Sequence, residues 1–276
     1  MREIIAKAID EVWTQANTKL ADYGRLIEPY TIGLSLDGEK FGTAVLCEYK
    51  LKYFLLTSAD IAKSFQKSKF VNLLLRFDNI RREYPAQLTK NFKVFEWDPA
   101  FDERMLNDVY KNQPKDLALI IPHKEIIETL KIYKAFYKIK EEPQSFSLKE
   151  ALISLGGIEP IYSVDRKTCQ LNVGPYGFVA SSYNQLSDID YIVCPVSNHT
   201  YEMRNLRRKA ITTFQGLTGS GLWKFVNDSP ILVGIAIAED PFGYNSSSGL
   251  RNVYFHGPHS ILSVLTTLGQ TNEQEP

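Results

Sequence analysis

Two series of short runs rich in β-branched and aromatic residues constrain the fold of this chain more than any other feature. Turn residues such as Gly, Asp and Asn separate the runs, a pattern typical of β-strands. The sequence therefore predicts an all-β protein with two antiparallel units of about six strands each, built as two barrels or as one large sandwich. The first series is 31–36, 42–49, 52–58, 71–77, 92–97 and 116–121, and the second is 159–164, 176–182, 191–197, 211–215, 222–226, 230–238 and 251–256.

Helical spacing of apolar residues surrounds and joins the two series. Residues 1–20 place apolar side chains at steps of three and four, which predicts an amphipathic helix. The same spacing predicts a linking helix over Lys124–Lys140 and a closing helix over 258–269. The tetrapeptide Ser147–Glu150, "SLKE", is typical of a capping box and predicts a short helix that ends at Gly156–Gly157.

These elements predict four consecutive parts of the chain. They are an N-terminal helix (1–25), a first β-unit (26–122), a helical linker (123–157) and a second β-unit with the C-terminal helix (158–276).

The charge of the chain argues against bulk attraction to polyanions. The 32 basic residues balance the 32 acidic ones, so we expect neither nucleic acid nor a membrane as a partner. The three cysteines, Cys47, Cys169 and Cys194, form no C-x-x-C pair, and the N-terminus lacks the apolar core of a signal peptide. We therefore expect a cytoplasmic protein. No phosphate-binding loop, dinucleotide fingerprint or zinc spacing is present, so we expect no cofactor and no metal.

Three segments in a fixed order resemble the trypsin-like serine peptidases of the chymotrypsin fold. The segment "FGTAVLCEYKLKYFLLTSAD" is similar to the family's strands before its histidine, "DLALII" to the strand that carries its aspartate, and "FQGLTGSGLW" to the loop that carries its serine. The strand "ILVGIAIAED" that follows is similar to the one behind the family's specificity pocket. The resemblance covers residue 31 to the C-terminus and implies two six-stranded antiparallel β-barrels.

The residues at the family's catalytic positions differ from those that hydrolysis requires. The resemblance implies that Asp60 stands at the histidine position, Asp116 at the aspartate position and Thr218 at the serine position. A serine peptidase needs a hydroxyl, an imidazole that takes its proton and a carboxylate that orients the imidazole. Threonine keeps a hydroxyl but adds a methyl group, and an ordinary carboxylate is a weak base for a hydroxyl. This degenerate triad predicts loss of hydrolysis.

The resemblance also implies that Asp60 and Asp116 lie within a few ångströms of each other. Two carboxylates that close repel when both are charged, so the pair is expected to share a proton, to recruit Lys or Arg, or to hold a cation. A structural pair bridged by a hydrogen bond or a basic side chain is the interpretation we favour over an aspartic-peptidase arrangement.

Other candidate nucleophiles and bases fit the resemblance poorly. The family places the side chain at the Ser220 position away from the cleft, and Gly221 replaces a family proline. The four histidines are expected to have structural or surface roles, since none falls at the family's histidine position; they are His123, His199, His256 and His259.

The backbone of the loop could still bind a ligand. The resemblance implies that Gly216 and the residue at the serine position supply N–H groups that hold a carbonyl or carboxylate oxygen. The candidate binding residues are Gly216, Leu217, Gly219 and Ser220. The basic stretch Arg204–Lys209 is expected to be a solvated loop.

The leading hypothesis is a trypsin-like pseudopeptidase that binds a peptide or protein or serves as a scaffold. One alternative is an active peptidase in which Thr218 works with an unconventional or partner-supplied base. Another is an unrelated all-β binding protein whose three matches are accidental.

Overall fold

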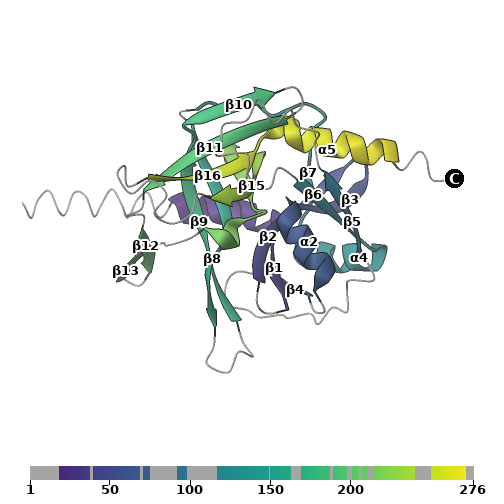
Figure 1. The fold of residues 1–276 in the computed structure, drawn as a ribbon, viewed down its shortest axis with the longest axis horizontal. Coiled ribbons are helices and arrows are strands. Elements are labelled where there is room, and N and C mark those ends of the chain that lie inside the picture. The colour runs from purple at the N-terminus through teal and green to yellow at the C-terminus, as the bar shows by residue number, and fades with distance from the viewer. Residues whose placement is uncertain are drawn as a thin grey trace, which may run out of the picture.

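Two large, mainly antiparallel sheets, a separate two-stranded hairpin and a few helices make up the described part of the chain (Figure 1). A computed structural model describes residues 19–37, 40–68, 71–74, 92–97, 117–148, 150–162, 169–186, 189–197, 201–204, 207–210, 214–239 and 250–271.

The first sheet contains seven strands in the order β4-β1-β2-β3-β6-β5, with β7 parallel to β2. Its strands are β1 (Thr31–Leu36), β2 (Lys40–Tyr49), β3 (Lys52–Ser58), β4 (Val71–Leu74), β5 (Phe92–Trp97), β6 (Leu117–Pro122) and β7 (Tyr137–Lys138). Every residue of β1 is buried, so both faces of this strand lie in the core. A strand buried on both faces is expected to lack alternating polar residues.

The second sheet also contains seven strands, in the order β10-β11-β16-β15-β14-β8-β9. Only two residues separate the end of β9 from the start of β10, although these strands lie at opposite edges of the sheet. Because so short a connection spans only about 10 Å, the sheet must curve until its edges approach each other. Its strands are β8 (Ala151–Tyr162), β9 (Cys169–Val179), β10 (Ser182–Leu186), β11 (Ile189–Ser197), β14 (Gly221–Val226), β15 (Ser229–Glu239) and β16 (Leu250–His256).

Short helices close the ends of the sheets. Residues 19–27 are helical and continue into the 3₁₀ turn η1 (Glu28–Tyr30). Helix α2 (Ala59–Lys67) follows β3 directly, because the Ser58 side chain accepts a hydrogen bond from the Ile61 N–H and caps it. Helices α4 (Lys124–Tyr133) and α5 (Pro258–Thr271) follow β6 and β16.

A shared apolar core joins the two sheets. It includes Val45 and Leu56 from the first sheet and Ile153, Trp223 and Ile235 from the second. Around Trp223 the rings of Tyr30 and Tyr137 lie with centroids 5.9 Å and 5.0 Å away. Burial of such large rings against each other stabilises the arrangement of one sheet on the other.

Most predicted elements are confirmed. The all-β fold with two antiparallel units is present, and strands coincide with the predicted runs at 31–36, 52–58 and 92–97. The closing helix is α5. Of the predicted N-terminal helix, residues 1–18 lie outside the described part. Strands β7 and β10 were not predicted and bring each sheet to seven strands.

The predicted helices in the linker need correction. Helix α4 ends at Tyr133, and Tyr137–Lys138 pairs with β2 instead of continuing it. The short helix predicted after Ser147 is wrong, because residues 151–162 form β8. The Ser147 N–H does donate to the Glu150 carboxylate (3.1 Å), but pairing of β8 with β9 and β14 outweighs the local helix signal.

Two further predictions in the second half are wrong. The expected loop at Arg204–Lys209 is part of a hairpin of β12 (Tyr201–Arg204) and β13 (Arg207–Ala210). A strand was also predicted over 211–215, of which residues 214–215 are described. Gln215 begins the 3₁₀ turn η4 (Gln215–Leu217) and belongs to no strand.

Candidate functional site

The turn Thr218–Gly219, between η4 and β14, is clamped to strand β2 by a single residue, Thr43. The Thr43 N–H donates to the Thr218 carbonyl (3.0 Å), and the Thr43 hydroxyl donates to the Gly216 carbonyl (2.9 Å). The Thr43 carbonyl in turn accepts a hydrogen bond from the Thr57 hydroxyl (2.8 Å). Thr43 and Thr57 are fully or almost fully buried, so these bonds form away from competing water.

Gly219 is required by this clamp. Its φ of +86° lies in the left-handed region that favours glycine. A Cβ at this position would lie far inside contact distance of the Thr43 carbonyl oxygen and the Thr57 hydroxyl. The glycine therefore lets the turn approach the first sheet more closely than any side chain would allow.

The other side of the turn is bonded to strand β15 of the second sheet. The Gly219 N–H donates to the Ala236 carbonyl (2.8 Å), and the Ala236 N–H donates to the Ser220 carbonyl (2.9 Å). Within the turn, the N–H of Ser220 donates to the Leu217 carbonyl (2.8 Å). The segment is thus fixed between both sheets by backbone hydrogen bonds.

Ser220 cannot act as an accessible nucleophile. Its side chain is fully buried and its hydroxyl oxygen lies 2.7 Å from that of Ser154. The Ser154 hydroxyl donates to the Gly221 carbonyl (2.8 Å). Since a hydroxyl has one hydrogen to donate, Ser220 donates to Ser154 and both hydroxyls are engaged. Leu217, another of the candidate binding residues, is buried in the apolar core of the second sheet.

The turn that carries Thr218 and the strand end that precedes Asp60 both bond to Thr43. Asp60 is exposed in the first turn of α2, three residues after Thr57, and Thr218 is half-buried. Asp116 lies outside the described residues, so its proximity to Asp60 stays a prediction. The next residue, Leu117, pairs with Ser58 at the end of β3.

The three described histidines all lie outside α2, the helix that carries Asp60. His123 precedes α4 and makes no side-chain cap there. His256 ends β16 and is fully buried, and His259 lies in the first turn of α5. His199 lies outside the described residues.

His256 and His259 belong to a buried polar cluster that the sequence did not reveal. The Asp190 carboxylate accepts hydrogen bonds from the backbone N–H of His259 (3.0 Å), the backbone N–H and hydroxyl of Ser260 (both 2.8 Å) and the Tyr183 hydroxyl (2.9 Å). An acidic side chain at the start of α5 also complements the helix dipole. Burial, together with the Asp190 charge, raises the pKa of Tyr183.

The cluster also contacts the ring of His256. The Ser260 hydroxyl accepts from the Asp190 N–H (2.8 Å) and lies 2.8 Å from the Asp190 carboxylate. The same hydroxyl oxygen lies 3.1 Å from His256 Nδ1, so this fully buried imidazole has a polar neighbour inside the fold. Residues about 70 positions apart build this cluster, and no local pattern could have signalled it.

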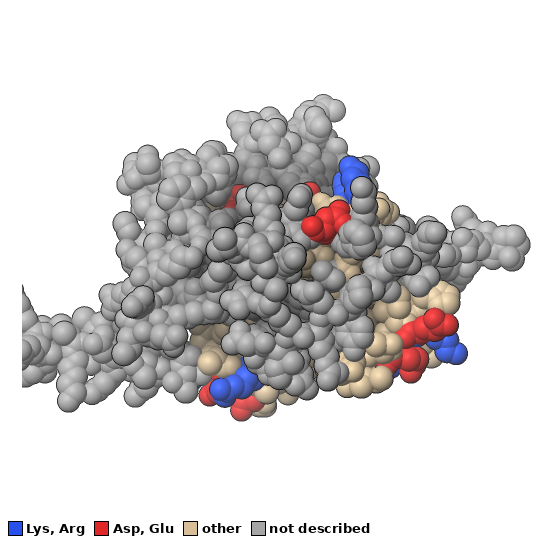
Figure 2. All heavy atoms as spheres, turned by 90° about the horizontal axis from the view of Figure 1, so that it is seen from below, with Lys and Arg blue, Asp and Glu red and all other residues tan. Residues whose placement is uncertain are grey.

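Among the described residues, neither clustered charge nor metal ligands mark a further site. Figure 2 shows basic and acidic side chains lying next to each other where that face is described. Within the described ranges, no group of three His, Cys, Asp or Glu side chains could hold a metal ion. No helix in the part of the chain that the structure describes is long and apolar enough to span a membrane.

Comparisons with known proteins identify the fold through structure and not through sequence. No family model matches the chain, and no curated protein matches it. Among solved structures, the inactivated protease paralogue S-I1 of the scabies mite is similar with a TM-score of 0.51 at 11% identity, covering 89% of this chain and 96% of that one. The HtrA-type protease AlgW with a tripeptide has a TM-score of 0.46 at 15% identity, covering 90% of this chain and 62% of that one.

The likeness to the mite protein concerns the fold alone. The two antiparallel sheets, together with the likeness to the mite protein, show that this chain has the two-unit all-β fold of trypsin-like proteases.

Proposed function

We propose that the chain is a trypsin-like peptidase homologue that no longer hydrolyses peptide bonds and instead binds a peptide or protein partner. The observation that carries this proposal is Asp60, exposed in the first turn of α2 where the resemblance expects a histidine. General-base catalysis needs an acceptor within hydrogen-bond reach of the nucleophile and with a suitable pKa. An aspartate at this position is a poor substitute for imidazole.

The buried state of the alternative groups supports the same conclusion. Ser220 is enclosed with Ser154, and His256 is held in the Asp190 cluster. Thr218 keeps a hydroxyl, but none of the three described histidines lies at the Asp60 position. The mite protein of similar fold carries the description of an inactivated protease, which is compatible with loss of hydrolysis on this architecture.

Binding is supported by the geometry of β15 beside the turn. Strand β14 pairs with β15 as far as Gly221 opposite Ile235, and the turn itself bonds β15 at Ala236. The edge that extends past these bonds is Ala238–Glu239, with β16 on its other side. The Glu239 carboxylate accepts a hydrogen bond from the Phe214 N–H (2.7 Å), which anchors the start of η4 to this strand. An extended peptide that adds to such a strand edge gains main-chain hydrogen bonds without any catalytic group.

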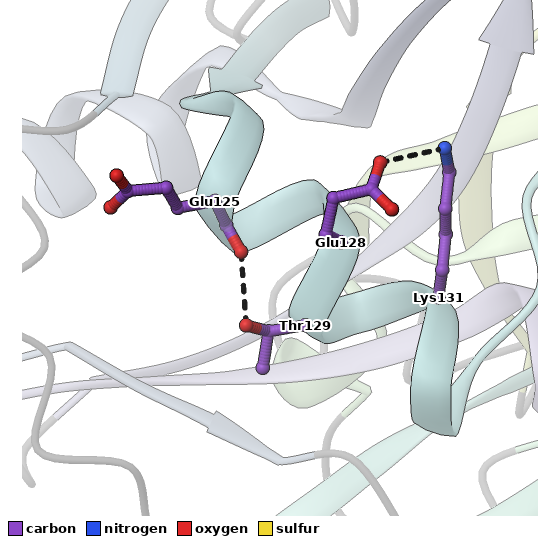
Figure 3. Close-up of polar contacts among 4 residues, drawn as sticks. All are labelled: Glu125, Glu128, Thr129 and Lys131. Atoms are coloured by element: carbon purple, nitrogen blue, oxygen red, sulfur yellow. Dashed lines mark hydrogen bonds and ion pairs between the residues drawn. The ribbon is translucent and has the colours of Figure 1, made fainter.

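Labelling with a fluorophosphonate probe tests the loss of hydrolysis. The wild-type chain is expected to remain unlabelled and to leave casein intact. The double variant Asp60→His with Thr218→Ser restores a base and a smaller nucleophile, and it is expected to gain labelling. Thr129→Ala, at an exposed threonine of α4 whose hydroxyl donates to the Glu125 carbonyl (2.9 Å, Figure 3), is the matched control for Thr218→Ala.

The alternative of an active threonine peptidase predicts the opposite pattern. Thr218 is only half-buried, so its hydroxyl could be reached if a partner supplied a base. Labelling of the wild-type chain that disappears in Thr218→Ala but persists in Thr129→Ala would establish this alternative and refute loss of activity.

Binding is tested separately with random peptides displayed on phage. Selected peptides are expected to bind the wild-type chain and to lose affinity in Gly219→Ala, which disturbs the turn beside β15. Equal binding to both would place the peptide site elsewhere. Failure to select any binder would refute the peptide-binding half of the proposal while leaving the probe result intact.

A further inference from the structure

A pocket lies between strand β10, the start of helix α5 and the linker that precedes β8. Strand β10 and helix α5 lie at the top of Figure 1. The volume of the pocket is about 220 Å³. Pockets that hold drug-sized ligands measure roughly 300–1,000 Å³, so this one has room for a single ring system. The residues that line it include Gln144, Ser145, Phe146, Tyr183, Gln185 and His259.

Two aromatic rings form a corner of this pocket. The rings of Phe146 and Tyr183 lie nearly perpendicular, at 83°, with their centroids 5.3 Å apart. Both residues are half-buried, so part of each ring stays open to the pocket that they line. A flat ligand ring placed in such a corner stacks on one aromatic ring and meets the edge of the other. Stacking of this kind contributes to binding without any charge.

Side chains that both donate and accept hydrogen bonds stand around the two rings. Gln144 Nε2 donates to the Glu142 carbonyl (2.8 Å), which leaves this amide one further N–H and its own oxygen. The Gln185 amide oxygen lies 3.5 Å from the Tyr183 hydroxyl. The His259 imidazole makes no hydrogen bond to another described residue, and a neutral imidazole carries one donor and one acceptor. The lining therefore suits a ligand with both kinds of group.

The charges that adjoin the pocket are already engaged. None of its described lining residues is Asp, Glu, Lys or Arg. The Asp190 carboxylate next to Tyr183 accepts four hydrogen bonds, and the Lys224 ammonium donates to the Ser145 carbonyl. An ionised ligand would lose its hydration here without gaining a counter-charge. The pocket therefore selects an uncharged ligand.

We propose that this pocket binds adenine, as the base of a free nucleoside. Adenine is flat and uncharged, and it carries an amino donor beside a ring acceptor, which a glutamine amide binds with two hydrogen bonds. The Gln144 amide supplies the matching acceptor and donor, the aromatic corner supplies stacking, and His259 supplies a further hydrogen bond. This site goes beyond the proposed peptide binding, because it shares no residue with the turn or with β15.

Isothermal titration calorimetry with adenosine tests the proposal. At the usual binding efficiency of small ligands, adenosine should bind with a Kd of about 0.1 mM. Purine riboside, which lacks the exocyclic amino group, should bind about tenfold more weakly, because the glutamine amide then loses one of its two partners. Adenosine monophosphate should bind no more tightly than adenosine, because the described lining supplies no cation for its phosphate.

Two variants with matched controls locate the site. Gln144→Leu removes the amide and should weaken adenosine binding about tenfold. His259→Leu should weaken it about threefold, and this change keeps the backbone N–H that bonds Asp190. The controls are Gln66→Leu in α2 and His123→Leu before α4, at exposed residues outside the lining, and both should bind adenosine as the wild type does. A thermal scan should give all four variants the Tm of the wild type.

Three outcomes would overturn the proposal. One is the absence of binding at about 1 mM adenosine, ten times the expected Kd. Another is equal affinity for adenosine in the wild type and in Gln144→Leu. The third is tighter binding of N-acetyl-tyrosinamide than of adenosine, because the pocket would then take an aromatic side chain of a partner. Fluorophosphonate labelling and phage selection concern the turn and β15, so their results are independent of these outcomes.

Discussion

Replacement of Gly219 by alanine is the sharpest test of the clamp between the two sheets. A φ of +86° costs an L-residue about 1–2 kcal/mol. The new Cβ would also collide with the Thr43 carbonyl oxygen and the Thr57 hydroxyl, so the turn must move away from the first sheet. That movement breaks the two bonds from Thr43 to the turn or the one from Thr57 to Thr43.

The expected loss follows from these contacts. The one or two broken hydrogen bonds contribute about 1 kcal/mol each, so together with the backbone strain we expect Gly219→Ala to lower the free energy of unfolding by about 2–4 kcal/mol. At about 2–4 °C per kcal/mol for a chain of this size, the Tm should fall by roughly 4–16 °C. Urea denaturation followed by tryptophan fluorescence and a thermal scan measure both quantities.

The control is Gly177→Ala in β9. Its added Cβ would meet only Leu20 Cδ1, at an ordinary contact distance of 3.9 Å, so the change should stay within about 0.5 kcal/mol. If Gly219→Ala also stays within about 1 kcal/mol of wild type, the turn does not depend on the close approach and the clamp is refuted. If the variant yields no folded protein, Thr57→Val, which removes one bond, should still show a loss of about 1 kcal/mol.

Three further predictions concern buried polar groups. Asp190→Asn places an amide where four hydrogen-bond donors converge, so urea denaturation should show that the free energy of unfolding falls by about 3–5 kcal/mol. A fall of less than about 1 kcal/mol would show that the cluster does not stabilise the fold. Burial raises the pKa of the Cys194 thiol to about 12, so near pH 8 only about one thiol in ten thousand is ionised; peptide mapping after iodoacetamide treatment should find Cys194 alkylated only in denaturant. Tyr183→Phe removes one donor to Asp190 and should cost about 1–3 kcal/mol, whereas Tyr53→Phe, whose ring lies half-buried against Phe136, is the control and should cost little.

The strands were predictable because their signals are local and agree with the tertiary structure. The run 31–36 combines β-branched and apolar residues, and both of its faces are buried. The segment Ser147–Glu150 shows the limit of local reasoning. The hydrogen bond from the Ser147 N–H to the Glu150 side chain forms as in a capping box, yet the residues that follow form β8, which pairs with β9 and β14. Long-range pairing overrides a single cap because it buries more surface and satisfies more backbone groups.

The candidate site was predictable only in part. The resemblance located the turn and the Thr57–Asp60 segment, which the structure brings to either side of Thr43. It gave no sign that the Thr43 hydroxyl would hold Gly216, because residues 173 positions apart share no local pattern.

The clamp on the turn has a consequence for how this chain can change by mutation. Both bonds from Thr43 to the turn end on backbone carbonyl oxygens, those of Gly216 and Thr218, and neither involves the Thr218 side chain. A change of the Thr218 side chain therefore leaves both of these hydrogen bonds in place. The backbone geometry of the turn is in this way independent of the chemical group that position 218 carries.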